Sequence, residues 1–274
     1  MSRSVLPSAS HVFSWYADAT KTIGVIKISR PRVKNCLNFQ TYTELNDTLL
    51  HFQDDPDVLA VIITGEGDEY FTSGTDVREG APMLPSRLIV RTLMMTLVHY
   101  TKILIGAVNG HAIGIGVTML TYCDFVFCTP STTFRTPFMA LGIVPELGAS
   151  VTFQALMGKT VANDLLLRGK IIDANRALPV GFVTEIVPSE GFLDGVVKLA
   201  AEVTGQLHAR HSLLLFKDQL NRLGPVSRQQ ILAAIDTEYV EIDRRHRTGE
   251  LRQLGEEYVA YLKEKKKALQ NSKL

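Results

Sequence analysis

Unbroken apolar runs and helix-like segments alternate along the first half of the chain. Val58 to Thr64 (VLAVIIT) and Ile103 to Val108 are short apolar runs, typical of strands buried on both faces. Leu84 to Tyr100, between them, is apolar-rich and has the length of a helix. A short apolar helix at Val117 to Cys123 and a strand at Asp124 to Thr129 then repeat the order. This alternation predicts a layered α/β fold.

The segment before these runs is predicted to form a hairpin and a helix. Alternating residues at Val12 to Tyr16 and Ile23 to Ile28 flank a short polar turn. Asn38 can cap the helix that follows, and Asp54-Asp55-Pro56 ends it. The apolar positions of this helix recur at helical spacing: Tyr42, Leu45, Leu49 and Phe52.

The character of the chain changes near residue 190. After a loop at 130–150, two helices at 150–157 and 160–167 and two short strands near 171 and 182–187, four amphipathic helices are predicted with no strand between them: 192–206, 211–223, 227–246 and 249–269. We therefore divide the chain into a core, residues 1–200, and a helical C-terminal region, residues 201–274. Appended amphipathic helices suggest oligomerisation.

Composition limits the classes of function. The 274 residues carry a formal net charge of +1 and are 46% hydrophobic, values of a globular protein that argue against a general nucleic-acid binder. No apolar run reaches the roughly 18 residues of a membrane span. The three cysteines, Cys36, Cys123 and Cys128, lack metal-ligand spacing, so we expect reduced thiols, two of them in the core, and no metal.

The last three residues are Ser272-Lys273-Leu274. A C-terminal SKL is read by the peroxisomal import receptor, and the N-terminus lacks the apolar segment of a secretory signal. We therefore expect the protein in a peroxisome or a related organelle such as a glycosome. Fatty acyl chains are a principal substrate class there.

Residues 103–150 contain the candidate chemistry. A glycine bend with Gly110, Gly114 and Gly116 follows the strand at 103–108, and the carboxylates of this stretch are Asp124 and Glu146. A strand, a glycine bend and a helix start present backbone N–H groups to an anion. A carboxylate returning to that bend would add a base.

Two familiar site patterns do not fit this bend. A dinucleotide fingerprint would need a third glycine where Met119 stands, and the phosphate-binding pattern GxxxxGK[ST] does not occur. A serine hydrolase is also disfavoured because no serine lies in a GxSxG turn.

A second glycine loop, Ser73-Gly74-Thr75-Asp76, follows the strand at 58–64. Consecutive parallel strands place their C-terminal loops at the same edge of a sheet, so this loop and Gly114-Ile115-Gly116 can converge. Two converging N–H groups would bind a carbonyl oxygen and its enolate. Each such donor is typically worth roughly 3 kcal/mol in the transition state. The alternative is that both loops are plain turns.

Several motifs in matching order resemble the crotonase (enoyl-CoA hydratase/isomerase) superfamily over residues 12–205. They are Phe71-Thr-Ser-Gly-Thr-Asp76, Val108-Asn-Gly-His-Ala-Ile-Gly-Ile-Gly116, Cys123-Asp124, Phe134-Arg-Thr-Pro137 and Leu141-Gly142. The resemblance implies a spiral of ββα units, a C-terminal helical trimerisation region and an acyl-CoA ligand, with no separate cofactor because coenzyme A is part of the substrate. It implies a homotrimer or a dimer of trimers.

The resemblance also implies roles for individual residues. The N–H groups of Thr75 and Ile115 would form the oxyanion hole, and the loop at 72–77 would lie near the adenine and pantetheine. The residues expected to bind substrate are Thr72, Ser73, Gly74, Asp76, Val77, Gly114, Phe138 and Leu141.

The acidic residues decide the reaction in this family. Hydratases use two glutamates, and this chain has Thr118 and Phe138 at those positions. Glu146 remains, placed as in peroxisomal Δ3,Δ2-enoyl-CoA isomerases, in which one glutamate is the base. We therefore expect isomerisation of 3-enoyl-CoA to 2-trans-enoyl-CoA in unsaturated fatty acid β-oxidation. A hydratase, a dienoyl-CoA isomerase and a non-catalytic acyl-CoA-binding protein remain alternatives.

Overall fold

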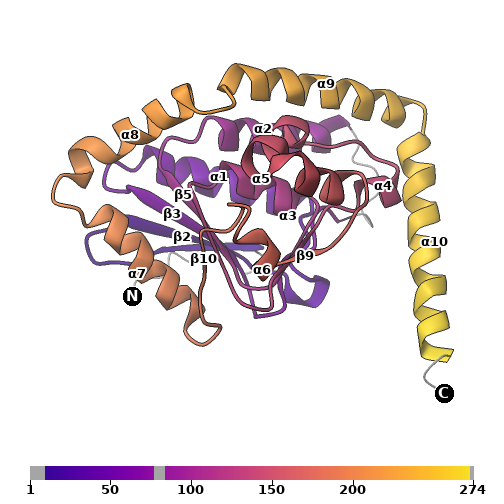
Figure 1. Cartoon of the computed structure of the whole chain (residues 1–274), viewed down its shortest axis with the longest axis horizontal. Coiled ribbons are helices and arrows are strands. Elements are labelled where there is room, and N and C mark those ends of the chain that lie inside the picture. Colours follow the sequence, from indigo (N-terminus) through magenta and orange to yellow (C-terminus); the bar gives the residue numbers. More distant parts are fainter. Residues whose placement is uncertain (1–9, 77–83, 272–274) are drawn as a thin grey trace.

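A computed structural model describes residues 10–76 and 84–271 of the chain (Figure 1). Two of the sequence predictions fall outside the described residues. They are the substrate contact at Val77 and the organelle address at Ser272-Lys273-Leu274. The structure is a mixed α/β fold with long helices at its C-terminal end, as predicted.

The larger sheet forms the centre of the molecule. Its six strands within the described residues run in the order β1-β2-β3-β5-β7-β10. The first two strands form the predicted antiparallel hairpin, and the other pairings are parallel. The strands are β1 (Val12–Tyr16), β2 (Ile23–Ile28), β3 (Ala60–Gly65), β5 (Ile103–Val108), β7 (Phe125–Cys128) and β10 (Glu185–Ile186).

A second, smaller sheet corrects the sequence prediction. Its strands run in the order β4-β6-β8-β9 where the sequence predicted mostly loops and the glycine bend. They are β4 (Tyr70–Thr72), β6 (His111–Ile113), β8 (Thr133–Arg135) and β9 (Ile172–Asp173). Strands of two or three residues are too short to show a periodic pattern, and their hydrogen-bond partners lie far away in the sequence.

Helices cover both faces of the larger sheet. Val61 and Ile63 of β3 belong to a core with α1 (Phe39–Asp54), α2 (Leu84–Val98) and α5 (Ala149–Leu166), whereas Ala60 and Ile62 face α7 (Phe192–Thr204). The alternation follows from the two-residue period of a strand. Asn38 caps α1 as predicted, accepting a hydrogen bond from the Thr41 N–H. Gly158, with non-helical φ and ψ, divides α5 into the two predicted halves.

Short helical elements lie between the strands and the longer helices. They are the 3-10 helices η1 (Pro31–Val33) and η3 (Met119–Tyr122) and the helices α3 (Ile115–Thr118), α4 (Phe138–Leu141) and α6 (Ala174–Ala177).

The C-terminal helices extend along the outside of the core. Figure 1 shows α8 and α9 passing over the helical layer and α10 running down past α4. Their bounds are α8 (Ala209–Leu223), α9 (Arg228–Arg247) and α10 (Glu250–Asn271). A capping box formed by Ser227 and Gln230 starts α9. No helix among the described residues has the length and apolar character to cross a membrane.

Asp124 has a structural role in this arrangement. Its carboxylate pairs with the buried Lys217 of α8, with Nζ 2.8 Å from Oδ2, and accepts a hydrogen bond from the N–H of Leu104. The ion pair fastens α8 to the start of β5. Cys36 and Cys128 are buried reduced cysteines and Cys123 is partly buried, in agreement with the sequence prediction.

Candidate active site

The two loops predicted to supply N–H donors lie at one edge of the smaller sheet. β4 and β6 run parallel, and Thr72 of β4 pairs with Ala112 of β6. Thr75 and Ile115 each follow three residues after this pair. The pairing therefore carries both residues to the same edge.

Gly74 brings the two backbones into direct contact. Its φ is +83°, and a Cβ atom at this position would lie 2.7 Å from the carbonyl oxygen of Ile113 and 3.8 Å from Gly114 Cα. Gly116 is packed just as closely against the side chain of Thr72. Glycine is required because a side chain at either position would separate the loops.

The hydrogen bonding around Thr75 leaves its N–H facing away from its neighbouring strand. Leu37 donates to the carbonyl of Gly74 at 2.8 Å and accepts from the N–H of Asp76 at 2.9 Å. The N–H groups of successive residues along an extended segment point to opposite sides, so the N–H of Thr75, between Gly74 and Asp76, points away from Leu37. Ile115 is the first residue of α3 and lacks an acceptor one turn earlier. Within residues 10–76 and 84–271, neither N–H has a protein acceptor.

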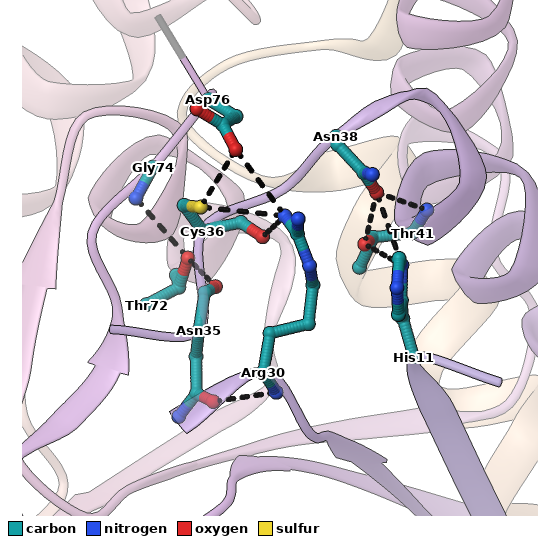
Figure 2. Close-up of polar contacts among 9 residues, drawn as sticks. All are labelled: His11, Arg30, Asn35, Cys36, Asn38, Thr41, Thr72, Gly74 and Asp76. Carbon is teal, nitrogen blue, oxygen red and sulfur yellow. Dashed lines mark hydrogen bonds and ion pairs between the residues drawn. The ribbon is translucent and has the colours of Figure 1, made fainter. Parts of the chain in front are cut away.

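The segment at 34–37 holds the Thr75 loop in place (Figure 2). The hydroxyl of Thr72 donates to the Asn35 carbonyl at 2.7 Å and accepts from the Gly74 N–H at 3.1 Å. The N–H of Ser73 donates to the carbonyl of Lys34 at 2.9 Å. The Thr72 side chain, expected to bind substrate, thus makes its described contacts with protein atoms and shapes the loop.

Asp76 is also directed toward the protein. Its carboxylate lies 3.6 Å from Arg30 Nη1 and accepts a hydrogen bond from Cys36 Sγ at 3.2 Å (Figure 2). The same guanidinium donates to the Cys36 carbonyl at 2.6 Å. Further along, the Asn38 side chain contacts His11 Nδ1 at 3.1 Å. Sequence reasoning missed the role of Arg30, which lies two residues after the end of β2 and contacts both Cys36 and Asp76.

Glu146 lies in the loop between α4 and α5, at a turn with unusual backbone geometry. The next residue, Leu147, is fully buried and has φ +57°, a conformation that costs a non-glycine residue of order 1 kcal/mol or more. Tyr122 donates its hydroxyl hydrogen to the Leu147 carbonyl at 2.7 Å, and the Glu146 carbonyl accepts from the Ala149 N–H at 3.1 Å. These contacts keep the strained turn in one conformation.

The electrostatic environment of Glu146 suits a proton carrier. The residue keeps partial contact with solvent, whereas its carboxyl group is enclosed by protein. Burial raises the pKa of Glu146 to about 7, with a further contribution from the negative charge of Glu238. A carboxyl group with a pKa near neutrality can both accept and return a proton at physiological pH.

Tyr42 connects Glu146 with the Thr75 loop. Its hydroxyl lies 2.6 Å from Thr75 Oγ1. Burial raises the pKa of Tyr42 well above its ordinary value, and the charge of Glu146 raises it further, so the phenol lies within electrostatic reach of that carboxylate. The structure therefore brings the base and one N–H loop into the same region. The sequence identified Tyr42 as a core position of α1 and gave no sign of this contact.

The remaining predicted positions surround this region or support it. Thr118 is fully buried, and Phe138 of α4 is 2% exposed. Neither side chain can carry a proton between carbon atoms. Leu141, at the end of α4, is partly buried, and Gly114 has a φ of +60° at the start of α3. Their contacts with a substrate stay a prediction.

Two cavities open elsewhere on the described surface. One, of about 240 Å³, lies between α5, α8 and α9 and is lined by Tyr122 and Lys217 among others. The other, of about 340 Å³, lies at the carboxyl end of the larger sheet near Lys27 and Asn109. Neither cavity is lined by Glu146. Among the described side chains no cluster of three His, Cys, Asp or Glu is placed to hold a metal ion.

Comparisons with known proteins identify the family of the chain. The sequence model of the enoyl-CoA hydratase/isomerase family matches residues 18–267. A mouse protein, peroxisomal enoyl-CoA delta isomerase 3, is 32% identical over 230 residues, which cover 79% of this chain and 72% of that protein. A crotonyl-CoA hydratase of Syntrophomonas wolfei is also 32% identical, over 69% of this chain and 76% of that protein.

Solved structures share the fold. The crystal structure of an enoyl-CoA hydratase/isomerase from Pseudoalteromonas atlantica superposes with a TM-score of 0.76 at 31% sequence identity, covering 89% of this chain and 94% of that one. Relatives with isomerase names and relatives with hydratase names are similarly distant. The chain belongs to the enoyl-CoA hydratase/isomerase family, the crotonase superfamily, as its motifs predicted.

Proposed function

We propose that this protein isomerises 3-enoyl-CoA to 2-trans-enoyl-CoA, with Glu146 as the proton carrier. The observation that carries the proposal is the position of Glu146, a carboxyl group with a pKa near 7. It interacts electrostatically with Tyr42, whose hydroxyl is hydrogen-bonded to Thr75. The two positions at which hydratases of this family are expected to carry glutamates hold Thr118 and Phe138, and neither side chain has a carboxyl group.

The reaction needs one base and one oxyanion site. The ionised Glu146 removes a proton from C2 of the 3-enoyl thioester, and the electrons of that C–H bond delocalise into a dienolate. The N–H groups of Thr75 and Ile115 hold the negative thioester oxygen. The protonated Glu146 then returns the proton to C4 while the double bond forms between C2 and C3. Atoms and charge balance without a cofactor, because coenzyme A is part of the substrate.

Hydration is the main rival within the family. Water would have to be activated by a second acidic group, and Thr118 and Phe138 lack one. A dienoyl-CoA isomerase would need a second carboxylate facing the substrate. Glu238 is a nearby carboxylate, but both of its oxygens accept hydrogen bonds from the start of α5. A non-catalytic acyl-CoA binder has no need for a buried carboxyl group of raised pKa.

The decisive assay follows conversion of 3-enoyl-CoA to the conjugated 2-enoyl thioester by purified protein. We expect Glu146→Gln to lower kcat by at least about 100-fold, because the general base is lost. Glu190→Gln, on an exposed turn, serves as the matched control. Full activity of Glu146→Gln would contradict the mechanism, and rapid formation of a hydroxyacyl-CoA from 2-enoyl-CoA would identify a hydratase.

We also propose a peroxisomal location and a trimeric assembly. The C-terminal SKL supports the first, and removing these three residues should leave a fluorescent fusion in the cytosol; unchanged import would contradict it. Apolar side chains exposed along and just before α8 support the second. They are Leu207, Leu215, Phe216, Leu220 and Leu223.

A further inference from the structure

The loop that carries Glu146 is held at both ends by the C-terminal helices. Gly142, at its beginning, lies against Leu254 of α10, where an added Cβ would approach Leu254 Cδ1 to 2.5 Å. The Gly142 carbonyl also accepts a hydrogen bond from the guanidinium of Arg245 in α9. Gly148, at the end of the loop, lies against Ile231 of α9, where an added Cβ would approach Ile231 Cγ2 to 3.2 Å. The loop cannot shift without disturbing α9 and α10.

Glu238 makes the strongest of these contacts. It comes from α9, is 6% exposed and accepts three hydrogen bonds from the start of α5. The donors are the N–H of Gly148 at 2.8 Å, the N–H of Ser150 at 3.1 Å and the Ser150 hydroxyl at 2.6 Å. A carboxylate that accepts first-turn N–H groups stabilises a helix start.

These contacts control the turn at Glu146. Leu147 has positive φ and Gly148 follows with φ +69°, so two successive residues adopt left-handed conformations between the catalytic candidate and α5. Such strain persists where surrounding contacts determine the conformation. Glu238 supplies those contacts on one side, and the hydroxyl of Tyr122 supplies one on the other.

We propose that Glu238 is a positioning residue for Glu146, fixing the turn that presents the carboxyl group and supplying the negative charge that faces it. This inference rests on the proposed function, in which Glu146 carries the proton. It makes the C-terminal helical region part of the catalytic unit, in addition to its proposed part in assembly.

The ionisable groups around Glu146 determine its electrostatic environment. Glu146 interacts electrostatically with Tyr42 of α1 and with Glu238 of α9. Glu238 acts in turn on Tyr122 of η3, and Tyr42 interacts with Tyr239 of α9. Burial raises the pKa values of Tyr42 and Tyr122 above their ordinary range, so these phenols stay neutral. Glu238 thus provides the charge that adds to burial in raising the pKa of Glu146.

The test compares Glu238→Gln with Ser150→Ala. Glutamine keeps the size and one acceptor oxygen, but it removes the charge and replaces the second acceptor oxygen with an NH2 group. Ser150→Ala removes one hydrogen bond and keeps the charge. We expect the pH midpoint of kcat/KM to fall by about one unit in Glu238→Gln and to stay in place in Ser150→Ala. Glu238→Ala, which also leaves the N–H groups unpaired, should lower kcat roughly tenfold or more with a smaller change in KM.

A direct titration separates this inference from the proposed function. NMR of protein labelled with 13C at the glutamate carboxyl carbon, with Glu146→Gln to assign the signal, reports the ionisation of Glu146 without any substrate. A downward shift of that titration in Glu238→Gln supports the inference even if the wild-type protein does not isomerise 3-enoyl-CoA. An unchanged titration and an unchanged pH profile, with only a lower Tm, would overturn it and leave Glu238 a purely structural residue.

Discussion

Glu146→Gln should stabilise the folded protein at alkaline pH. The pKa of Glu146 is about 7 in the folded chain and 4.5 for an ordinary glutamate, a difference of about 2.5 units. The folded state therefore binds the proton more tightly than the unfolded state. Because an acid with a raised folded pKa favours folding at low pH, this contribution is complete below about pH 4.5 and is lost as pH rises through about 7.

The magnitude follows from the same difference. Each pKa unit corresponds to about 1.4 kcal/mol, so a difference of about 2.5 gives at most about 3.5 kcal/mol, and partial solvent contact of Glu146 lowers this figure. Glutamine has nearly the same shape and no charge. The free energy of unfolding of Glu146→Gln relative to wild type should therefore rise by up to about 3 kcal/mol between pH 4.5 and pH 8.5.

Urea unfolding at a series of pH values measures this difference. Protein concentration is held constant because assembly would contribute to stability. Glu190→Gln, on the exposed turn before α7, should show no comparable slope against pH. If the difference between Glu146→Gln and wild type is the same at pH 4.5 and pH 8.5, Glu146 does not carry the buried charge that the mechanism requires.

Three other substitutions test the site and the assembly. Gly74→Ala should lower the free energy of unfolding by about 3 kcal/mol or more and abolish activity, because its Cβ would meet a backbone carbonyl; Gly67→Ala, with nearly the same φ but open space, should cost only about 1 kcal/mol. Equal losses in the two variants would contradict the close contact of the loops. Tyr42→Phe should lower kcat/KM about fivefold, since it removes a hydrogen bond worth about 1 kcal/mol to Thr75, and unchanged kinetics would exclude a role for the phenol. Leu220→Glu, on a side chain 73% exposed, should shift the mass measured by light scattering from that of the proposed trimer to smaller species, and an unchanged mass would place the interface elsewhere.

The hydrophobic pattern predicted the larger sheet and its helices well. β5 spans Ile103–Val108 as predicted, β1 and β2 form the expected hairpin, and Asn38 caps α1. These features depend on residues close together in the chain, where periodicity and capping operate. Of the smaller sheet only β9 was predicted, as the short strand near residue 171. The other three strands were missed because three residues show no period and their pairing is decided by distant segments.

The chemistry divides in the same way. The sequence by itself determined the glycine loops, the carboxylate at Glu146 and the absence of acidic residues at Thr118 and Phe138, because these are properties of residue types in local motifs. The tertiary structure decided which groups act on them. Tyr42 reaches the Thr75 loop across 33 residues and Glu238 reaches the start of α5 across about 90. No local pattern records such contacts, since hydrogen bonding and burial depend on how the helices pack.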